Sequence, residues 1–444
     1  MSIKRNSSYL FGARIAGFFL TMVDSVVISR CLGPDQRGIY ILILVINYMA
    51  TNFGNCGLDF TNTYELAKRK NTIAQVHSHS LVLIALVSIL AFVLYFLFQE
   101  TFHSTLVKSV SSKQVLIALG LIPFSLYIRY WGAIMAGFER FKLTSILNTC
   151  TGFINTAGIV TILLILKGGV NELLIWMLIA YMLFSSIRVG ILKVYGELGF
   201  DFSWQRFWNS LSFGLKGHVG NIATYIILRF DNFVLNSFCG PGGVGIYSLA
   251  VSLAEKIHFV PQPILSAAAP RISSTVHSEA TRLTAVLIRH TLIIGLLLAL
   301  ILALTVPWLL PLIYGVEYRD SVLPLLIMLP GMIAVMAGTG FSSYVTFQLG
   351  KPQITSLVAW CNLAVTLPMM FLMIRSFGVL GAAWTTTISY MLIIVVNGTL
   401  FLKFSGERFR VLVPRYEDLK VYTSLAGNVY SRIFPRLSVA KSKV

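Results

Sequence analysis

Apolar residues in this chain gather in runs of about twenty, separated by short polar stretches. A helix rises about 1.5 Å per residue, so a run of this length crosses the hydrocarbon layer of a membrane. The runs carry scattered Gly and Pro and lack the alternation typical of membrane-barrel strands. The pattern predicts an all-α polytopic membrane protein with twelve spans, at roughly 9–29, 39–59, 79–98, 114–136, 143–166, 172–192, 211–236, 243–266, 286–307, 320–346, 353–374 and 378–402.

The first run resembles a signal peptide in its length and in the basic residues before it. However, Arg14 and Asp24 interrupt it, and no cleavage site of small residues follows. It is therefore predicted to be a retained helix.

Composition supports a membrane protein. Hydrophobic residues make up 56% of the 444 and charged residues only 12%, whereas a soluble domain has roughly twice that charged share. The net charge of +18 is dispersed between the spans. A basic nucleic-acid-binding domain would instead concentrate it on one face, so nucleic acid is not an expected partner.

Lys and Arg residues predict the orientation. If the N-terminus lies inside, the inner loops are richer in basic residues than the outer loops, so both termini are predicted to be cytoplasmic. This places the protein in the inner (cytoplasmic) membrane. Two interpretations of the basic tail at 403–444 stay open: it binds anionic lipid, or it is a topology signal.

No pattern in the sequence predicts catalysis, a metal or a cofactor. The five cysteines are dispersed, with no histidines at metal-ligand spacing. There is no phosphate-binding loop and no nucleophile motif. The sequence therefore predicts a protein that is not an enzyme.

An internal repeat divides the chain. The motif Gly33-Pro34, three residues, then Gly38-Ile39-Tyr40 recurs 207 residues later as Gly240-Pro241 and Gly245-Ile246-Tyr247. At the same offset Asp24 matches Asp231, and Pro123 matches Pro330. Short Gly-Pro turns recur in many membrane proteins, but that does not explain the matching aspartates.

The repeat predicts three parts: an N-terminal six-helix bundle at 1–200, a C-terminal six-helix bundle at 201–402 and the tail. An even number of helices in each half makes the repeats parallel, and transporters place substrate sites between such repeats.

Ionisable residues inside spans mark candidate functional positions. Arg14, Thr21 and Asp24 share a face of the first helix, and Asp231 continues a similar stripe in the seventh, near Lys216 and Arg229. We interpret the two stripes as the lining of a shared cavity. The alternative is that Arg229 and Asp231 only brace the bundle.

Other charged residues lie within or at the ends of the predicted spans or beside a predicted kink. Glu255 and Lys256 form a pair before Pro261, where a kink is expected, and either couple an ion or are structural. Arg129 is either functional or part of an interfacial belt with the aromatic residues around it. Arg188 and Arg289 lie near cytoplasmic ends and are expected to reach water.

Several motifs resemble one transporter family. They are Leu32-Gly33-Pro34 with Gly38-Ile39-Tyr40 in the first half, and Leu349-Gly350-Lys351 and Gly381-Ala382-Ala383-Trp384 in the second. In order and spacing they resemble oligosaccharide flippases of the multidrug/oligosaccharidyl-lipid/polysaccharide exporter superfamily, the O-antigen and exopolysaccharide branch.

The resemblance implies that two bundles alternate between inward-open and outward-open states and carry a polyprenyl-pyrophosphate-linked sugar repeat unit to the outer leaflet. The lipid tail would stay in the bilayer. Arg14 matches the family's basic position for the pyrophosphate, and a guanidinium suits a phosphate because it is planar and bidentate. Arg129, Lys216 and Arg229 are further candidates. A polysaccharide polymerase is an expected partner.

Three other functions fit the sequence less well. A drug/cation antiporter of the same superfamily would need acidic cavity residues, and here basic residues predominate. A membrane polymerase would have a large outer loop, but the longest, at about 99–113, is short. The buried charges disfavour a scaffold that transports nothing.

Overall fold

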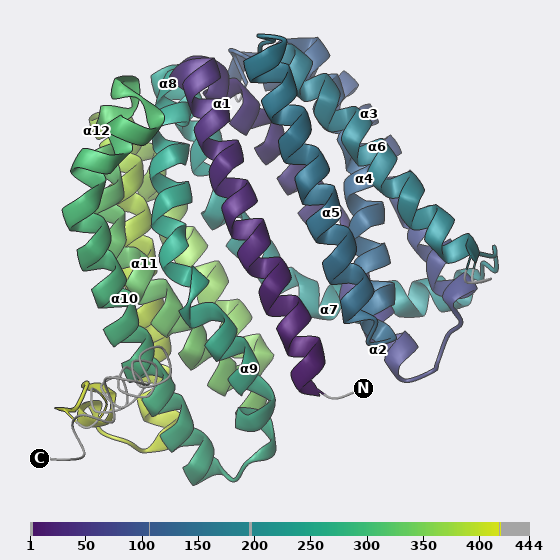
Figure 1. Ribbon diagram of the computed structural model, residues 1–444. Helices are drawn as coiled ribbons and strands as arrows, with labels where there is room; N and C mark the ends of the chain where they lie inside the picture. Colours follow the sequence, from purple (N-terminus) through teal and green to yellow (C-terminus); the bar gives the residue numbers. More distant parts are fainter. Residues whose placement is uncertain (1–2, 106, 195–197, 417, 419–444) are drawn as a thin grey trace, which may run out of the picture. The chain divides into compact units, whose positions relative to one another are not determined.

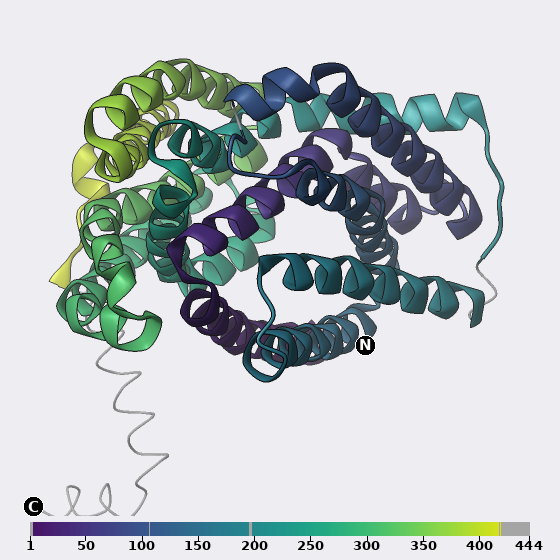
Figure 2. The same cartoon turned by 90° about the horizontal axis from the view of Figure 1, so that it is seen from above.

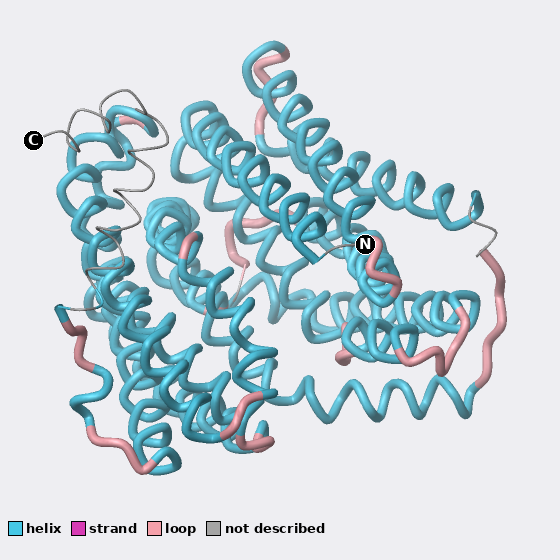
Figure 3. The backbone as a smooth tube through the Cα atoms, turned by 60° about the horizontal axis from the view of Figure 1, so that its bottom comes forward, coloured by secondary structure: helices cyan, strands magenta, loops and turns pink. Residues whose placement is uncertain are grey.

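The computed structural model describes residues 3–105, 107–194, 198–416 and 418. The part of the predicted tail after 418 lies outside the described residues. Within the described ranges the chain is helical and has no strand, as predicted, and short loops join the helices (Figure 3).

The helices are shown in Figure 1. Their bounds are α1 (Ile3–Gly54), α2 (Leu58–Ala67), α3 (Ile73–Thr105), α4 (Ser112–Gly137), α5 (Phe141–Val160), α6 (Val170–Val194), α7 (Trp204–Arg229), α8 (Asp231–Ala254), α9 (Pro261–Ser274), α10 (His277–Tyr314), α11 (Val322–Ser343) and α12 (Pro352–Ser405). The π helices Thr161–Ile165 and Tyr344–Gln348 extend α5 and α11, and short 3₁₀ helices lie at Glu255–Phe259, Val316–Ser321 and Phe409–Leu412.

Nine helical stretches within the described residues are long and apolar enough to cross a membrane. Three of them exceed one crossing and contain a glycine with positive φ, at Gly33, Gly240 and Gly378. Each of these three is long enough for two crossings, so the nine stretches accommodate the twelve predicted spans. The prediction of an all-α polytopic membrane protein is confirmed.

Two of these glycines show the repeat in the backbone. Gly33 has φ 68° and ψ 177°, and Gly240 has φ 69° and ψ −177°. Only glycine adopts this region readily, because a Cβ atom would clash with the backbone. The following proline cannot donate a helical hydrogen bond, so helix direction changes at the same point of each repeat.

Contacts between residues divide the chain into two compact units. The first contains Met1–Leu253, Thr305–Met328 and Ala359–Thr386, and the second contains Ala254–Leu304, Leu329–Val358 and Thr387–Val444. Within the first unit, α1 packs most extensively against α5, and Figures 1 and 2 both show the two helices side by side. The predicted bundle boundary at residue 200 stays a prediction.

Arg188 and Arg289 do not reach water as expected. Arg188 is 2% exposed, donates to the Phe184 carbonyl (2.9 Å) and lies over the ring of Trp131. Arg289 is 7% exposed and forms a two-pronged ion pair with Asp418 (2.8 and 3.1 Å). Burial is tolerated because each guanidinium has hydrogen-bond acceptors in place of water.

Candidate functional site in the first unit

A polar stripe runs along the second part of α1 into α2. Tyr48 and Asn52 lie four residues apart on one face of α1, and Asn55 and Asp59 follow after three and four residues, in the turn after α1 and in α2. The chain turns between the helices at Cys56 and Gly57, with φ of 50° and 73°. Asp59 therefore lies in the first turn of α2, where a carboxylate is favoured by the helix dipole.

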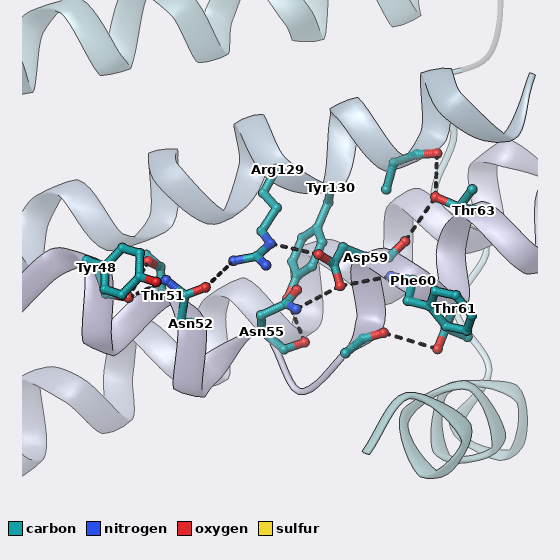
Figure 4. A network of polar contacts seen from close by, with 12 residues as sticks. Tyr48, Thr51, Asn52, Asn55, Asp59, Phe60, Thr61, Thr63, Arg129 and Tyr130 are labelled. Atoms are coloured by element: carbon teal, nitrogen blue, oxygen red, sulfur yellow. Dashed lines mark hydrogen bonds and ion pairs between the residues drawn. The ribbon is translucent and has the colours of Figure 1, made fainter. Parts of the chain in front are cut away.

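Arg129 of α4 lies at the centre of this stripe. Its Nε donates to Oδ2 of Asp59 (2.8 Å), and its Nη1 donates to Oδ1 of Asn52 (2.8 Å). Asn55 donates to Oδ1 of Asp59 (2.8 Å), as does the amide of Phe60 (2.8 Å). Figure 4 shows Arg129 reaching from α4 between these residues. The ion pair is half-buried, with 31% of the Arg129 side chain exposed.

Helix α7 supplies aromatic and basic groups to the same place. The Tyr225 ring meets that of Tyr48 edge-on, at 6.0 Å between centroids. The guanidinium of Arg229 lies 5.8 Å from the centre of the Tyr48 ring, a favourable cation–π distance. A close approach of backbones holds α7 here, since a Cβ atom at Gly57 would overlap the carbonyl of Gly214.

We call Tyr48, Asn52, Asp59, Arg129, Tyr225 and Arg229 the polar cluster. One carboxylate and two guanidinium groups leave it cationic. Asp59 pairs with Arg129 at contact distance, and the Arg229 guanidinium lies over the Tyr48 ring. The cluster can bind an anion through planar donors.

The structure brings together two of the four residues predicted to bind pyrophosphate. Arg129 and Arg229 converge on the polar cluster. Arg14 and Lys216 are exposed on α1 and α7. Their roles stay predictions.

The paired aspartates differ in environment. Asp24 is half-buried, and its Oδ1 is buried without a hydrogen-bond partner in the structure. Asp231 is 4% exposed and accepts hydrogen bonds from Tyr247 (2.6 Å) and Asn232 (2.8 Å). The Tyr247 hydroxyl also lies 2.8 Å from that of Thr386. The contacts of Asp231 are those of a structural carboxylate, while its predicted place in a cavity stays untested.

The α-helix is interrupted at Glu255 and Lys256, where a kink is expected. Both are half-buried in the 3₁₀ helix Glu255–Phe259, directly before α9 begins at Pro261. They lie in the second compact unit, and ion coupling by them stays a prediction.

The interfacial-belt interpretation of Arg129 is wrong. The adjacent Tyr127, Tyr130 and Trp131 are buried, at 7%, 1% and 1% exposure. The three side chains stand at positions i, i+3 and i+4, which share one face of a helix. They pack inside the fold, where α4 contacts α1, α2, α3 and α6.

Sequence reasoning missed Asp59, Asn52, Tyr48 and Tyr225. Asp59 stands at the last position of the span predicted at 39–59. The spacing of Tyr48, Asn52, Asn55 and Asp59 is a signal that could have found the stripe. The partnership with Arg129, 70 residues away, leaves no local signal.

Comparison with known proteins agrees with this architecture. Residues 3–276 match the family model described as polysaccharide biosynthesis protein. A protein of Shigella flexneri described as an O-antigen transporter is 26% identical over 416 residues, covering 88% of this chain and 96% of that protein. One of Escherichia coli (strain K12) with the same description is 25% identical, covering 90% and 99%.

Solved structures show the same fold. The inward-facing conformation of a multidrug resistance MATE family transporter of the MOP superfamily has a TM-score of 0.72 at 16% identity, covering 89% of this chain and 98% of that chain. The lipid II flippase MurJ in an inward closed conformation has a TM-score of 0.68 at 16% identity, covering 98% and 100%. The chain therefore belongs to the polysaccharide biosynthesis protein family and has the fold of the MOP superfamily.

Proposed function

We propose that this protein flips a polyprenyl-pyrophosphate-linked sugar repeat unit from the cytoplasmic to the outer leaflet of the inner membrane. Its general function follows from its relatives: it is a multi-pass membrane transporter of polysaccharide biosynthesis, and not an enzyme. To this general function we add four proposals: the lipid-linked substrate, the direction of its movement, the cytoplasmic location of both termini, and delivery of the substrate to a polysaccharide polymerase.

The polar cluster carries the proposal. A charged guanidinium within a membrane-spanning helix is costly unless it is paired or used. Arg129 is held by one carboxylate, one amide and the Tyr225 side chain, and the Arg229 guanidinium lies over the Tyr48 ring. A pyrophosphate offers more negative charge than Asp59 and would compete for Arg129. Protonation or displacement of Asp59 would release that guanidinium to the substrate.

A drug/cation antiporter is the second candidate. A cationic drug would need a free carboxylate, but Asp59 is occupied by Arg129, Asn55 and the Phe60 amide. The cluster therefore favours an anionic substrate.

The experiment uses a cell that makes polyprenyl-linked repeat units and lacks its own flippase. The wild-type chain should restore surface polysaccharide and remove the accumulated lipid-linked units. Arg129→Gln should leave those units on the cytoplasmic side, because the amide cannot replace a charged fork. Both pools are measured by lipid extraction and surface labelling, against protein abundance in the membrane.

Arg271→Gln is the matched control. It removes the same charge from α9, where Arg271 makes only an exposed ion pair with Glu279 (3.3 Å), and such pairs contribute little. It should export normally. Normal export by Arg129→Gln at wild-type abundance would contradict the proposal.

A further inference from the structure

An apolar groove of about 580 Å³ opens in the first compact unit. Its walls come from α1, α3, α4, α7, α8 and α12, and include Met49, Phe53, Leu94, Phe98, Ile226 and Phe230. Tyr95 also lines the groove, and its hydroxyl is hydrogen-bonded to Nε2 of His103 (3.1 Å). Phe53, Leu94 and Phe98 remain 37%, 46% and 58% exposed, so the groove is open along one side.

This groove adjoins the polar cluster on α1. Tyr48 and Asn52 belong to the cluster, while the next residues, Met49 and Phe53, line the groove. Consecutive residues on a helix point about 100° apart. The polar face and the apolar wall are therefore neighbouring faces of one helix.

The same register occurs on α7. Tyr225 and Arg229 belong to the cluster, while Ile226 and Phe230 line the groove. The two helices meet at the Tyr48–Tyr225 ring contact. A cationic site and an apolar groove thus run side by side along both helices, as an amphipathic ligand with an anionic head would require.

We propose that this groove holds the head-proximal isoprene units of the polyprenyl chain while the pyrophosphate lies in the polar cluster. The inference rests on the proposed function and assigns the tail a place in the protein. It departs from the expectation that the whole tail stays in the bilayer. The chemistry fits, because a groove lined by apolar side chains offers water no hydrogen-bond partners and gains free energy when hydrocarbon fills it.

The test uses the full chain in nanodiscs of one fixed phospholipid composition. Binding of inorganic pyrophosphate, farnesyl pyrophosphate and undecaprenyl pyrophosphate is measured for the wild type and two variants. Ala91→Trp places a large ring in the groove, which Ala91 lines. Ala85→Trp is the control, because Ala85 is an exposed residue of the same helix, outside the groove lining.

The wild type should bind both prenyl pyrophosphates more tightly than inorganic pyrophosphate. Ala91→Trp should lose about tenfold in affinity for them, about 1.4 kcal/mol, and keep the affinity for inorganic pyrophosphate. Ala85→Trp should match the wild type throughout. The probes also partition into the bilayer, but this contribution is the same for all three proteins because they share one nanodisc composition. It therefore does not affect the differences in affinity between them.

A second measurement covers the case in which Ala91→Trp fails to fold. A polyprenyl pyrophosphate with a diazirine on its second isoprene unit should label Phe53, Phe98 or Phe230 in the wild type. Two results would overturn the inference by showing that ordinary bilayer lipid fills the groove. One is that excess phospholipid abolishes the labelling, and the other is that the two tryptophan variants bind the prenyl pyrophosphates with equal affinity. If the wild type binds neither pyrophosphate nor its prenyl esters, the proposed function itself fails.

Discussion

The backbone of Gly38 lies directly against the carbonyl of Pro241, and Gly245 lies in the same way against the carbonyl of Pro34. These residues belong to the equivalent turns of the two repeats, so the glycine of each turn packs against the proline carbonyl of the other turn. Arg37 strengthens the contact by donating to the Gly245 carbonyl (2.6 Å) and to Ser248 (3.0 Å). The repeat thus produces a reciprocal backbone contact within the first compact unit.

Gly38→Ala and Gly245→Ala should each destabilise the protein. A Cβ atom at either position would overlap a backbone carbonyl, which cannot move as a flexible side chain can. Overpacking of this kind costs about 1–3 kcal/mol, seen as a lower unfolding temperature in detergent. Gly132→Ala in α4 is the control, because nothing lies within 4 Å of its Cβ position. Equal unfolding temperatures for all three variants would refute the tight contact.

Arg14 should act through its charge. If it binds pyrophosphate, Arg14→Ala should stop surface polysaccharide and accumulate lipid-linked units without loss of protein. Arg14→Lys should keep partial activity, since a point charge survives but the bidentate fork is lost. Arg14→Glu should be worst because it repels the anion. Surface polysaccharide is compared with membrane abundance. A parallel fall in abundance for Ala and Glu would indicate that Arg14 only braces the bundle.

Exchanging the charges of Arg129 and Asp59 distinguishes a substrate-binding role of this pair from a purely structural role. The double variant Arg129→Asp with Asp59→Arg retains an ion pair between α4 and α2, so abundance in the membrane should largely recover relative to Arg129→Asp alone. Transport should not recover, because the guanidinium has moved away from Asn52 and Tyr225. The measurement is export at matched abundance. If the swap restored export as well as abundance, the pair would be structural.

The ion pair between Arg289 and Asp418 should attach the end of the described chain to α10 in a pH-dependent way. Burial alone would raise the pKa of Asp418, but hydrogen bonds from the Arg289 side chain and the Arg415 amide, with the positive charge of Arg289, lower it. A lowered pKa means that the contribution to stability is complete above the ordinary carboxyl value of 3.8 and is lost as the pH falls through the lowered pKa.

Limited proteolysis checks this attachment. Cleavage between Gly406 and Asp418 should be slow at pH 7 and should become faster as the pH falls below the ordinary carboxyl value of 3.8. A neutral protease is used at pH 7 and pepsin in acid, and each cleavage rate is divided by the rate for an unfolded standard. Asp418→Asn should increase cleavage at pH 7, costing about 1–3 kcal/mol, because the amide leaves Arg289 without a counter-charge. Cleavage unaffected by this substitution would show that the pair does not hold the segment.

The sequence by itself determined the class of protein, its helices and its repeat. These depend on local features: runs of apolar residues long enough for a membrane, and glycine–proline pairs that redirect a helix wherever they occur. Only the tertiary structure decided which charges meet. Arg129 pairs with Asp59 across 70 residues and Arg289 with Asp418 across 129. Helix periodicity places each side chain on a face but cannot say which helix that face meets. The packing of α4 against α2, and of α7 beside α1, brings the residues of the polar cluster together from separate predicted spans.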